Sequence, residues 1–354
     1  MECEVEEKNV MANMGDVAKD AGVSKSTVSN VFSGKRSISE AVRQRVLESA
    51  NRLNYRPNYF ARSMVTKETR IIGLVMDSRK VKFNQYNLSF INGVLRECSS
   101  QGYRLLIDTL PSSFRNKVTQ MTSEPVDGEI ILDPLTVDER VEERVKSGRL
   151  MTIIGKPPRK YEAALPYVNN DNVQAAETAT SYLLELGHRN ILMINAVKKH
   201  TVSQDRKAGF MLSYSKRGLS PDEELIVYRD DAVSSAEFGY RTVMKWMEKF
   251  PDITAVIADT DQIALGVYRA AMELGLSIPD DLSVIAFNND TVYPGEFHPP
   301  LTSVELNGEI LGQEAAKLLI EQLVAKNKLV KQVTIQSRLV LRASCGPIKQ
   351  GFPV

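Results

Sequence analysis

Residues 13–65 read NMGDVAKDAGVSKSTVSNVFSGKRSISEAVRQRVLESANRLNYRPNYFARSMV, and this stretch decides the fold of the first part of the chain. Asn13 and Ser24 stand where side-chain oxygens can cap the free amides of the first two helices, and a third helix is predicted from Ser39. Gly22 ends the first of them, because glycine adopts the left-handed backbone that a helix stop requires. Apolar residues recur at helical spacing. They are Met14, Val17, Ala18, Ala21, Val28, Val31, Val42, Val46, Ala50 and Leu53. We therefore predict three short helices that close a small core.

The second predicted helix exposes polar side chains near its start. Lys25, Ser26, Ser29 and Asn30 project outward, whereas Val28 points into the core. In a helix-turn-helix, the second helix enters the major groove and reads base edges with residues near its N-terminus. The pattern predicts DNA binding, although each of these polar residues taken singly could be solvated surface.

A second motif follows the three helices. Pro57 blocks helix continuation, and Asn58 can cap a short helix that extends through residue 64. One or two isolated turns of helix are marginal in water, so this segment would order only against a partner. DNA lying between two domains is a good candidate for that partner.

The residues of both motifs closely resemble one family. D-V-A-x-x-A-G-V-S-x-x-T-V-S (residues 16–29) and L-N-Y-x-P-N-x-x-A-R-S (residues 53–63) resemble the lactose-repressor/galactose-repressor (LacI/GalR) family of bacterial transcription regulators. The resemblance implies a homodimer, usually a repressor, on a near-palindromic double-stranded operator. It also implies a hinge helix in which Met64 stands where leucine commonly wedges into the minor groove. The expected DNA contacts are Asn13, Lys25, Ser26, Thr27, Ser29, Asn30, Tyr55, Asn58, Ala61, Arg62 and Met64.

Composition sets the remaining bounds. The 354 residues carry a net charge of only +1, yet residues 13–70 hold eleven Lys or Arg against five Asp or Glu, a net +6. A basic head on a near-neutral body is expected if only the head meets phosphates. The three cysteines lack metal-ligand spacing, so we predict reduced thiols, no metal and no cofactor. We find no signal peptide and no membrane-spanning run, which predicts a cytoplasmic protein without membrane contact.

From residue 70 onward, short apolar runs alternate with helical stretches, the pattern of parallel sheets covered on both faces. The predicted strands are residues 71–76, 104–109, 128–132, 150–155, 190–195, 224–229, 255–259 and 282–287, and QVTIQSRLVLRAS holds the final strands. The predicted helices include residues 173–186, 236–249, 262–274 and 308–325. The fold class is α/β, with two doubly wound lobes. The resemblance implies a periplasmic-binding-protein-like body with helix 308–325 on the first lobe.

Predicted domain limits follow from these patterns. Residues 1–12 form a disordered extension, 13–56 the helix-turn-helix domain, 57–70 the hinge helix and linker, 71–345 the effector-binding and dimerisation body, and 346–354 a tail. Within the body, the first lobe takes about 71–168 and 300–328, and the second about 169–299 and 329–345.

Polar side chains follow several predicted strands, where ligands of open α/β sheets sit. Short polar groups with one arginine suit the hydroxyls of a sugar. The resemblance matches this set to effector contacts, namely Asp77, Tyr86, Arg206, Thr260 and Asn288. Structural roles remain open: Arg206 could cap a helix or pair with an acid, Asp261 could be a helix N-cap, and Asn288 a turn residue. We expect His200 at the surface.

These observations predict an allosteric regulator that represses carbohydrate-utilisation genes. A nucleotide-binding or hydrolytic enzyme is disfavoured, because the chain lacks G-x-x-x-x-G-K-[ST], G-x-G-x-x-G after a strand, and G-x-S-x-G. A transport solute-binding protein would need a leader and no basic head. The alternative is the same DNA-binding regulator controlled by a non-sugar corepressor or by a protein, such as a phosphocarrier-type partner on the first lobe.

Overall fold

The computed structural model describes residues 12–34, 36–56, 68–76, 85–108, 125–230, 232–288, 294–327 and 330–348. It divides into two compact units, Met1–Thr69 and Arg70–Val354, which we call the head and the body. No helix in these ranges is both long and apolar enough to cross a membrane.

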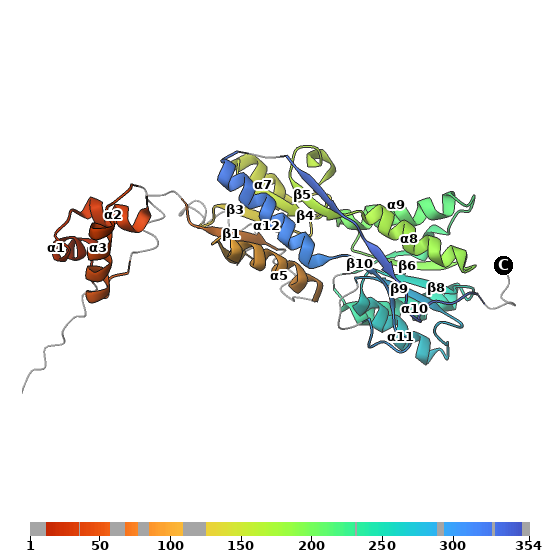
Figure 1. Cartoon of the computed structure of the whole chain (residues 1–354). Helices are drawn as coiled ribbons and strands as arrows, with labels where there is room; N and C mark the ends of the chain where they lie inside the picture. Colours follow the sequence, from red (N-terminus) through yellow and green to blue (C-terminus); the bar gives the residue numbers. More distant parts are fainter. Residues whose placement is uncertain are drawn as a thin grey trace, which may run out of the picture. The chain divides into compact units, whose positions relative to one another are not determined.

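The head contains the three predicted helices, α1 Met14–Asp20, α2 Lys25–Ser33 and α3 Glu40–Arg52 (Figure 1). Asn13 caps α1 in a reciprocal capping box, and the Ser24 hydroxyl accepts a hydrogen bond from the Thr27 amide at the start of α2. Gly22 has φ +65°, as its role as a helix stop requires. All ten apolar residues predicted for the core pack into one cluster, so this prediction is confirmed.

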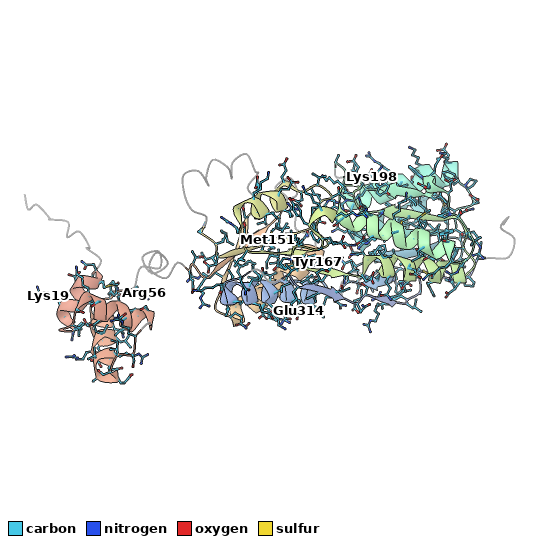
Figure 2. The ribbon with its side chains drawn as sticks, turned by 90° about the horizontal axis from the view of Figure 1, so that it is seen from above. Lys19, Arg56, Met151, Tyr167, Lys198 and Glu314 are labelled. Atoms are coloured by element: carbon cyan, nitrogen blue, oxygen red, sulfur yellow. The ribbon has the colours of Figure 1, made fainter. Side chains whose placement is uncertain are left out.

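The first lobe of the body is built on a six-stranded parallel sheet in the order β11-β5-β4-β3-β1-β2. Its strands are β1 Ile71–Val75, β2 Arg104–Asp108, β3 Gly128–Leu132, β4 Met151–Ile154, β5 Tyr167–Asn170 and β11 Gln332–Ile335. Its helices are α5 Gln85–Ser100, α7 Glu139–Ser147 and α12 Gly308–Ala325, with a 3-10 turn at Arg159–Tyr161. Helix α12 packs on α5 and on β3, β4 and β5, as predicted for the first lobe. In Figure 2, Met151, Tyr167 and Glu314 mark this lobe and Lys198 marks the other.

The second lobe has its own six-stranded sheet in the order β12-β10-β9-β8-β6-β7, in which only β12 runs antiparallel to its neighbour. Its strands are β6 Ile191–Asn195, β7 Ile226–Tyr228, β8 Ala255–Ala258, β9 Ser283–Phe287, β10 Thr302–Glu305 and β12 Arg338–Val340. Its helices are α8 Asn172–Glu185, α9 Thr201–Ser215, α10 Ser235–Lys249 and α11 Asp261–Glu273, with a 3-10 turn at Glu223–Leu225.

Two of the predicted lobe limits are wrong. Residues 300–328 were expected in the first lobe, but β10, which lies in this range, pairs with β9 of the second lobe's sheet. Residues 329–345 were expected in the second lobe, but β11, which lies in that range, pairs with β5 of the first lobe's sheet. Strand β5, reading YVNN, was not predicted at all. The chain therefore returns to the first lobe after β10 rather than before it, and it crosses back to the second lobe between β11 and β12. These limits were missed because strand pairing is set by tertiary contacts that a local sequence pattern does not contain.

Candidate nucleic-acid interface and effector site

The start of α2 presents two exposed side chains, Lys25 and Ser26. The Ser26 hydroxyl lies 2.7 Å from that of Ser24, and the Thr27 hydroxyl lies 2.9 Å from the same atom. Thr27 therefore turns back toward the helix cap. Of the other predicted contacts on α2, Ser29 and Asn30 are half-buried.

The stem of Lys25 lies across the first turn of α1. A Cβ atom added at Gly15 would come within 2.8 Å of the Lys25 Cε atom, so Gly15 leaves room for this side chain. Asn13 serves as the α1 cap: its Oδ1 accepts a hydrogen bond from the Gly15 amide at 2.7 Å. A cap at this position fixes the turn beside Lys25.

One cluster ties α1 to α3 and so holds the helix-turn-helix at a fixed angle. The buried Ser49 hydroxyl donates to Asp20 Oδ2 at 2.6 Å and lies 3.3 Å from the Val17 carbonyl oxygen, and Arg52 contacts the same carboxylate at 2.5 Å. The hydrogen bonds from Ser49 and Arg52 lower the pKa of Asp20. No local pattern predicts this cluster, because its partners lie 29 to 32 residues apart.

Tyr55 packs edge-to-face on Phe32, with ring centroids 5.9 Å apart, and burial raises the pKa of its hydroxyl. Its ring therefore belongs to the head's core. The other predicted contacts beyond α3, Asn58, Ala61, Arg62 and Met64, lie outside the described residues.

In the body, three of the five predicted effector residues lie at neighbouring strand ends. Arg206 on α9 is buried, makes an ion pair with Asp259 after β8, and stacks its guanidinium 3.9 Å from the ring centroid of Phe287 in β9. Thr260 follows Asp259, and Asn288 follows Phe287. Asp77 lies outside the described residues, and Tyr86 belongs to α5 with its side chain likewise outside them.

Each of these three residues also has a structural role. Arg206 pairs with an acid, which was the open alternative for it. Thr260, rather than Asp261, is the N-cap of α11 and accepts a hydrogen bond from the Ile263 amide at 3.2 Å. Asn288 has φ +76°, a left-handed turn conformation that asparagine tolerates better than most residues. The Nε atom of Arg206 has no such structural role: it is buried and has no hydrogen-bond partner in the described part of the chain.

The expectation that His200 lies at the surface is wrong. His200 is buried at the start of α9, and its Nδ1 lies 2.7 Å from Oδ1 of Asp133, which follows β3 in the other lobe. Beside this contact, the Thr136 amide donates to the Lys199 carbonyl at 2.8 Å. His200 and Leu135 also form an isolated antiparallel β-bridge between their backbones. The two lobes therefore meet directly between residues 133–136 and 199–201.

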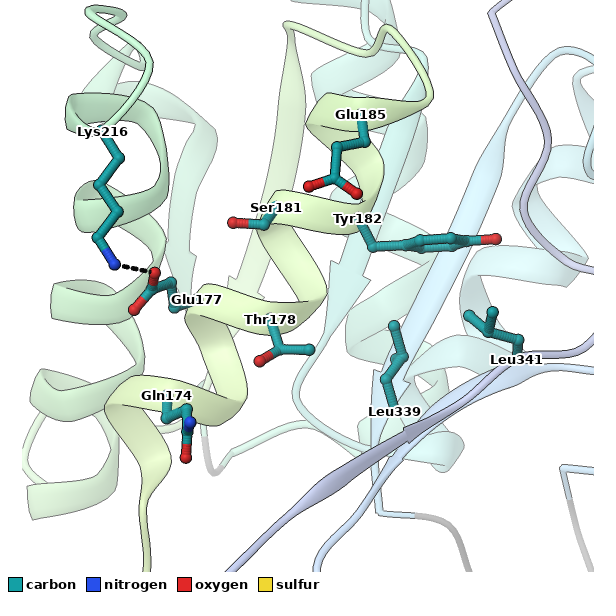
Figure 3. Close-up of a pocket in the computed structure, with 9 residues that line it drawn as sticks. All are labelled: Gln174, Glu177, Thr178, Ser181, Tyr182, Glu185, Lys216, Leu339 and Leu341. Carbon is teal, nitrogen blue, oxygen red and sulfur yellow. Dashed lines mark hydrogen bonds and ion pairs between the residues drawn. The ribbon is translucent and has the colours of Figure 1, made fainter.

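Two surface hollows of the second lobe have linings that do not include Arg206, Thr260 or Asn288. The larger, of about 530 Å³, lies between α8 and β12, where Tyr182 faces Leu339 and Leu341, and Lys216 pairs with Glu177 (Figure 3). The smaller, of about 410 Å³, lies beside β7 and includes Lys198 and Tyr228.

Comparison with known families gives two matches. Residues 13–58 match the family described as bacterial regulatory proteins, lacI family, and residues 180–345 match the periplasmic binding protein-like domain. The first match covers the head through the start of the predicted hinge, and the second covers most of the second lobe and α12.

Individual relatives match over nearly their full length. The transcriptional repressor PurR of Klebsiella pneumoniae is 30% identical over 342 residues, covering 94% of this chain and 97% of that protein. The transcriptional regulator CelR of Thermobifida fusca is 28% identical over 332 residues, covering 93% and 96%. A solved complex of the transcriptional regulator CelR with cellobiose aligns with a TM-score of 0.72 at 25% identity, over 94% of this chain and 99% of that one. The lac repressor dimer on its operator shares the fold, with a TM-score of 0.78 at 23% identity over 94% and 98%.

Proposed function

Because the chain belongs to the lacI family of bacterial regulatory proteins and is thus a DNA-binding transcriptional regulator, we propose that it is a repressor of carbohydrate-utilisation genes. A sugar bound between the two lobes controls its affinity for double-stranded operator DNA. The regulatory function follows from the family, which also confirms the expectation of a regulator rather than an enzyme.

The observation that carries the DNA-binding proposal is the exposed start of α2 on a fixed head. Lys25 and Ser26 are exposed in the first turn of α2, and the buried Val28 anchors this helix to the core. Helix N-termini in this motif face base edges, and lysine or serine can donate hydrogen bonds there. Ser49 and Asp20 hold the supporting helices in place, so the reading surface is preorganised.

The sugar proposal rests on the group around Arg206. Its unpartnered Nε is a buried donor, Asp259 after β8 pairs with the same guanidinium, and the polar residues Thr260 and Asn288 follow β8 and the neighbouring strand β9. Because Asp259 already neutralises the guanidinium, the site offers little net charge, which favours a neutral polyol over an anion. The solved complex of CelR with cellobiose, a neutral sugar, is consistent with a neutral polyol as the ligand.

A homodimer is part of the proposal. Several helices of the body carry large apolar side chains that remain exposed, among them Leu88 and Leu95 on α5, and Leu265 and Met272 on α11. Exposed apolar side chains on helices of a soluble chain often mark a partner surface, and a two-fold dimer places two heads on two operator half-sites.

A fluorescence anisotropy titration of the protein on its own promoter DNA, repeated with mono- and disaccharides, tests the proposal. Specific binding that one sugar strengthens or weakens supports it and fixes whether the sugar is inducer or corepressor. Specific binding that no sugar changes would refute the sugar effector and favour a non-sugar corepressor or a protein, including a phosphocarrier-type partner.

A further inference from the structure

The two lobes are joined by three chain connections that run close together. They are Asn170–Asn172 between β5 and α8, Glu305–Gly308 between β10 and α12, and Ile335–Arg338 between β11 and β12 (Figure 1). Any rotation of one lobe on the other must bend these three segments, because they are the covalent links between the lobes.

One side chain holds all three connections. Asn170 is 3% exposed, and its Nδ2 donates to the Leu306 carbonyl at 3.0 Å and to the Ile335 carbonyl at 3.1 Å. A side-chain amide has two N–H donors, and here each one reaches a different connection. Asn170 itself lies on the remaining connection, so a single group links all of them.

Neighbouring residues reinforce this arrangement. Asn307 Nδ2 donates to the Gln336 carbonyl at 3.2 Å, which ties the second connection to the third. Asn307 also has φ +53°, a conformation that marks a sharp local bend. In the third connection, the Ser337 hydroxyl is buried without a hydrogen-bond partner in the described ranges. A buried hydroxyl without a partner costs free energy, so another arrangement of this connection could satisfy it.

We propose that Asn170 is a positioning residue that makes the three connections bend as one hinge, and that it thereby couples the ligand site to operator affinity. This inference rests on the proposed function for its regulatory part. While both hydrogen bonds from the Asn170 side-chain amide are formed, the three connections keep one geometry and the lobes rotate about one axis. Without them each connection flexes separately, and rotation of the lobes becomes less concerted.

The test compares Asn170→Asp with a matched control. Aspartate keeps the size of asparagine but replaces both donors with an acceptor facing two carbonyls. The control is Gln322→Glu, because Gln322 is 1% exposed and its Nε2 donates to the Met151 carbonyl at 3.2 Å and to Thr152 Oγ1 at 3.1 Å. Gln322 lies on α12 and its partners on β4, so this amide joins elements of one lobe only.

The first measurement needs neither DNA nor ligand. Spin labels at Lys146→Cys on α7 and Lys245→Cys on α10, with the native cysteines replaced by alanine, report the distance between the lobes by pulsed electron resonance. We expect Asn170→Asp to broaden the distance distribution and Gln322→Glu to leave it unchanged. Equal widths in both variants would overturn the inference. Should circular dichroism show that Asn170→Asp does not fold, Asn170→Ala, which adds no charge, takes its place with the same expected outcome.

The second measurement is the fold-change in operator Kd caused by the effector sugar. Allosteric coupling is typically about 5- to 150-fold, and we expect Asn170→Asp to reduce it to about twofold or less while Gln322→Glu retains it. Full coupling in Asn170→Asp would overturn the regulatory part. A broadened distribution in a protein whose operator affinity no sugar changes would leave the hinge supported and refute the sugar proposal instead.

Discussion

The buried ion pair between Arg206 and Asp259 gives the sharpest prediction. Replacing Arg206 with methionine keeps most of the side-chain volume but leaves the Asp259 carboxylate, only 9% exposed, without its cation. Breaking a buried pair by removing one partner costs about 3–5 kcal/mol, because the remaining charge stays desolvated. The guanidinium also stacks on Phe287, so its removal loses a ring contact.

The assay is urea unfolding followed by circular dichroism on four proteins: the wild type, Arg206→Met, Asp259→Asn and the double variant. In a double-mutant cycle, residues in contact couple by up to about 3 kcal/mol, and we expect a value near that limit. The double variant should then be more stable than Arg206→Met alone. For a domain of this size, about 3–5 kcal/mol corresponds to a fall in Tm of roughly 6–20 °C. A loss below about 1 kcal/mol in Arg206→Met, or additive effects in the double variant, would refute the reasoning.

The same four proteins separate stability from ligand contact. A folded double variant that binds operator DNA but no longer responds to the effector would place Arg206 in the ligand site, provided that Asp259→Asn alone still responds. A double variant that still responds would show that Arg206 serves only as the structural partner of Asp259. Loss of response in Arg206→Met alone would decide nothing, since that variant is also expected to be unstable.

Three further predictions concern other parts of the chain. Lys25→Ala with Ser26→Ala should reduce the preference for operator over random DNA by about 30-fold or more, because two base contacts of about 1–3 kcal/mol each together contribute at least about 2 kcal/mol. Anisotropy titrations on both DNAs check this, and an equal loss of affinity on each would mean phosphate contact instead. Gly312→Ala should destabilise the body by at least about 2 kcal/mol, since the new Cβ would lie 2.2 Å from a carbonyl oxygen of α5, and unchanged urea unfolding would contradict this. Burial raises the pKa of the Cys345 thiol to about 11 and that of the Cys98 thiol to about 12, so both thiols stay protonated at pH 8. Both should therefore react with a disulfide reagent more than about a hundredfold slower than free cysteine, because the thiolate is the reactive form. The rate of the Cys345 reaction should rise as the pH approaches 11. Fast labelling of either thiol in the native protein at pH 8 would be inconsistent with the raised pKa of that thiol.

Local patterns were enough for the head. Asn13, Ser24 and Gly22 determine where its helices start and stop, and Val17, Val28 and Val46 determine which faces are buried. These signals act between residues a few positions apart, so they can be recognised in the sequence without any knowledge of the fold. The alternating strands and helices of the body were recognisable for the same reason, as were most of their limits.

The tertiary structure alone decided which lobe each of the last strands joins and which groups meet across the chain. Strands β10 and β11 exchanged their expected lobes, and β5 formed from YVNN because an adjacent strand edge was free to pair with it. His200 met Asp133 across 67 residues, and Arg206 met Asp259 across 53. The physical reason is that strand pairing and buried charge pairing depend on which surfaces the folded chain brings together, and neither leaves a periodic trace among neighbouring residues.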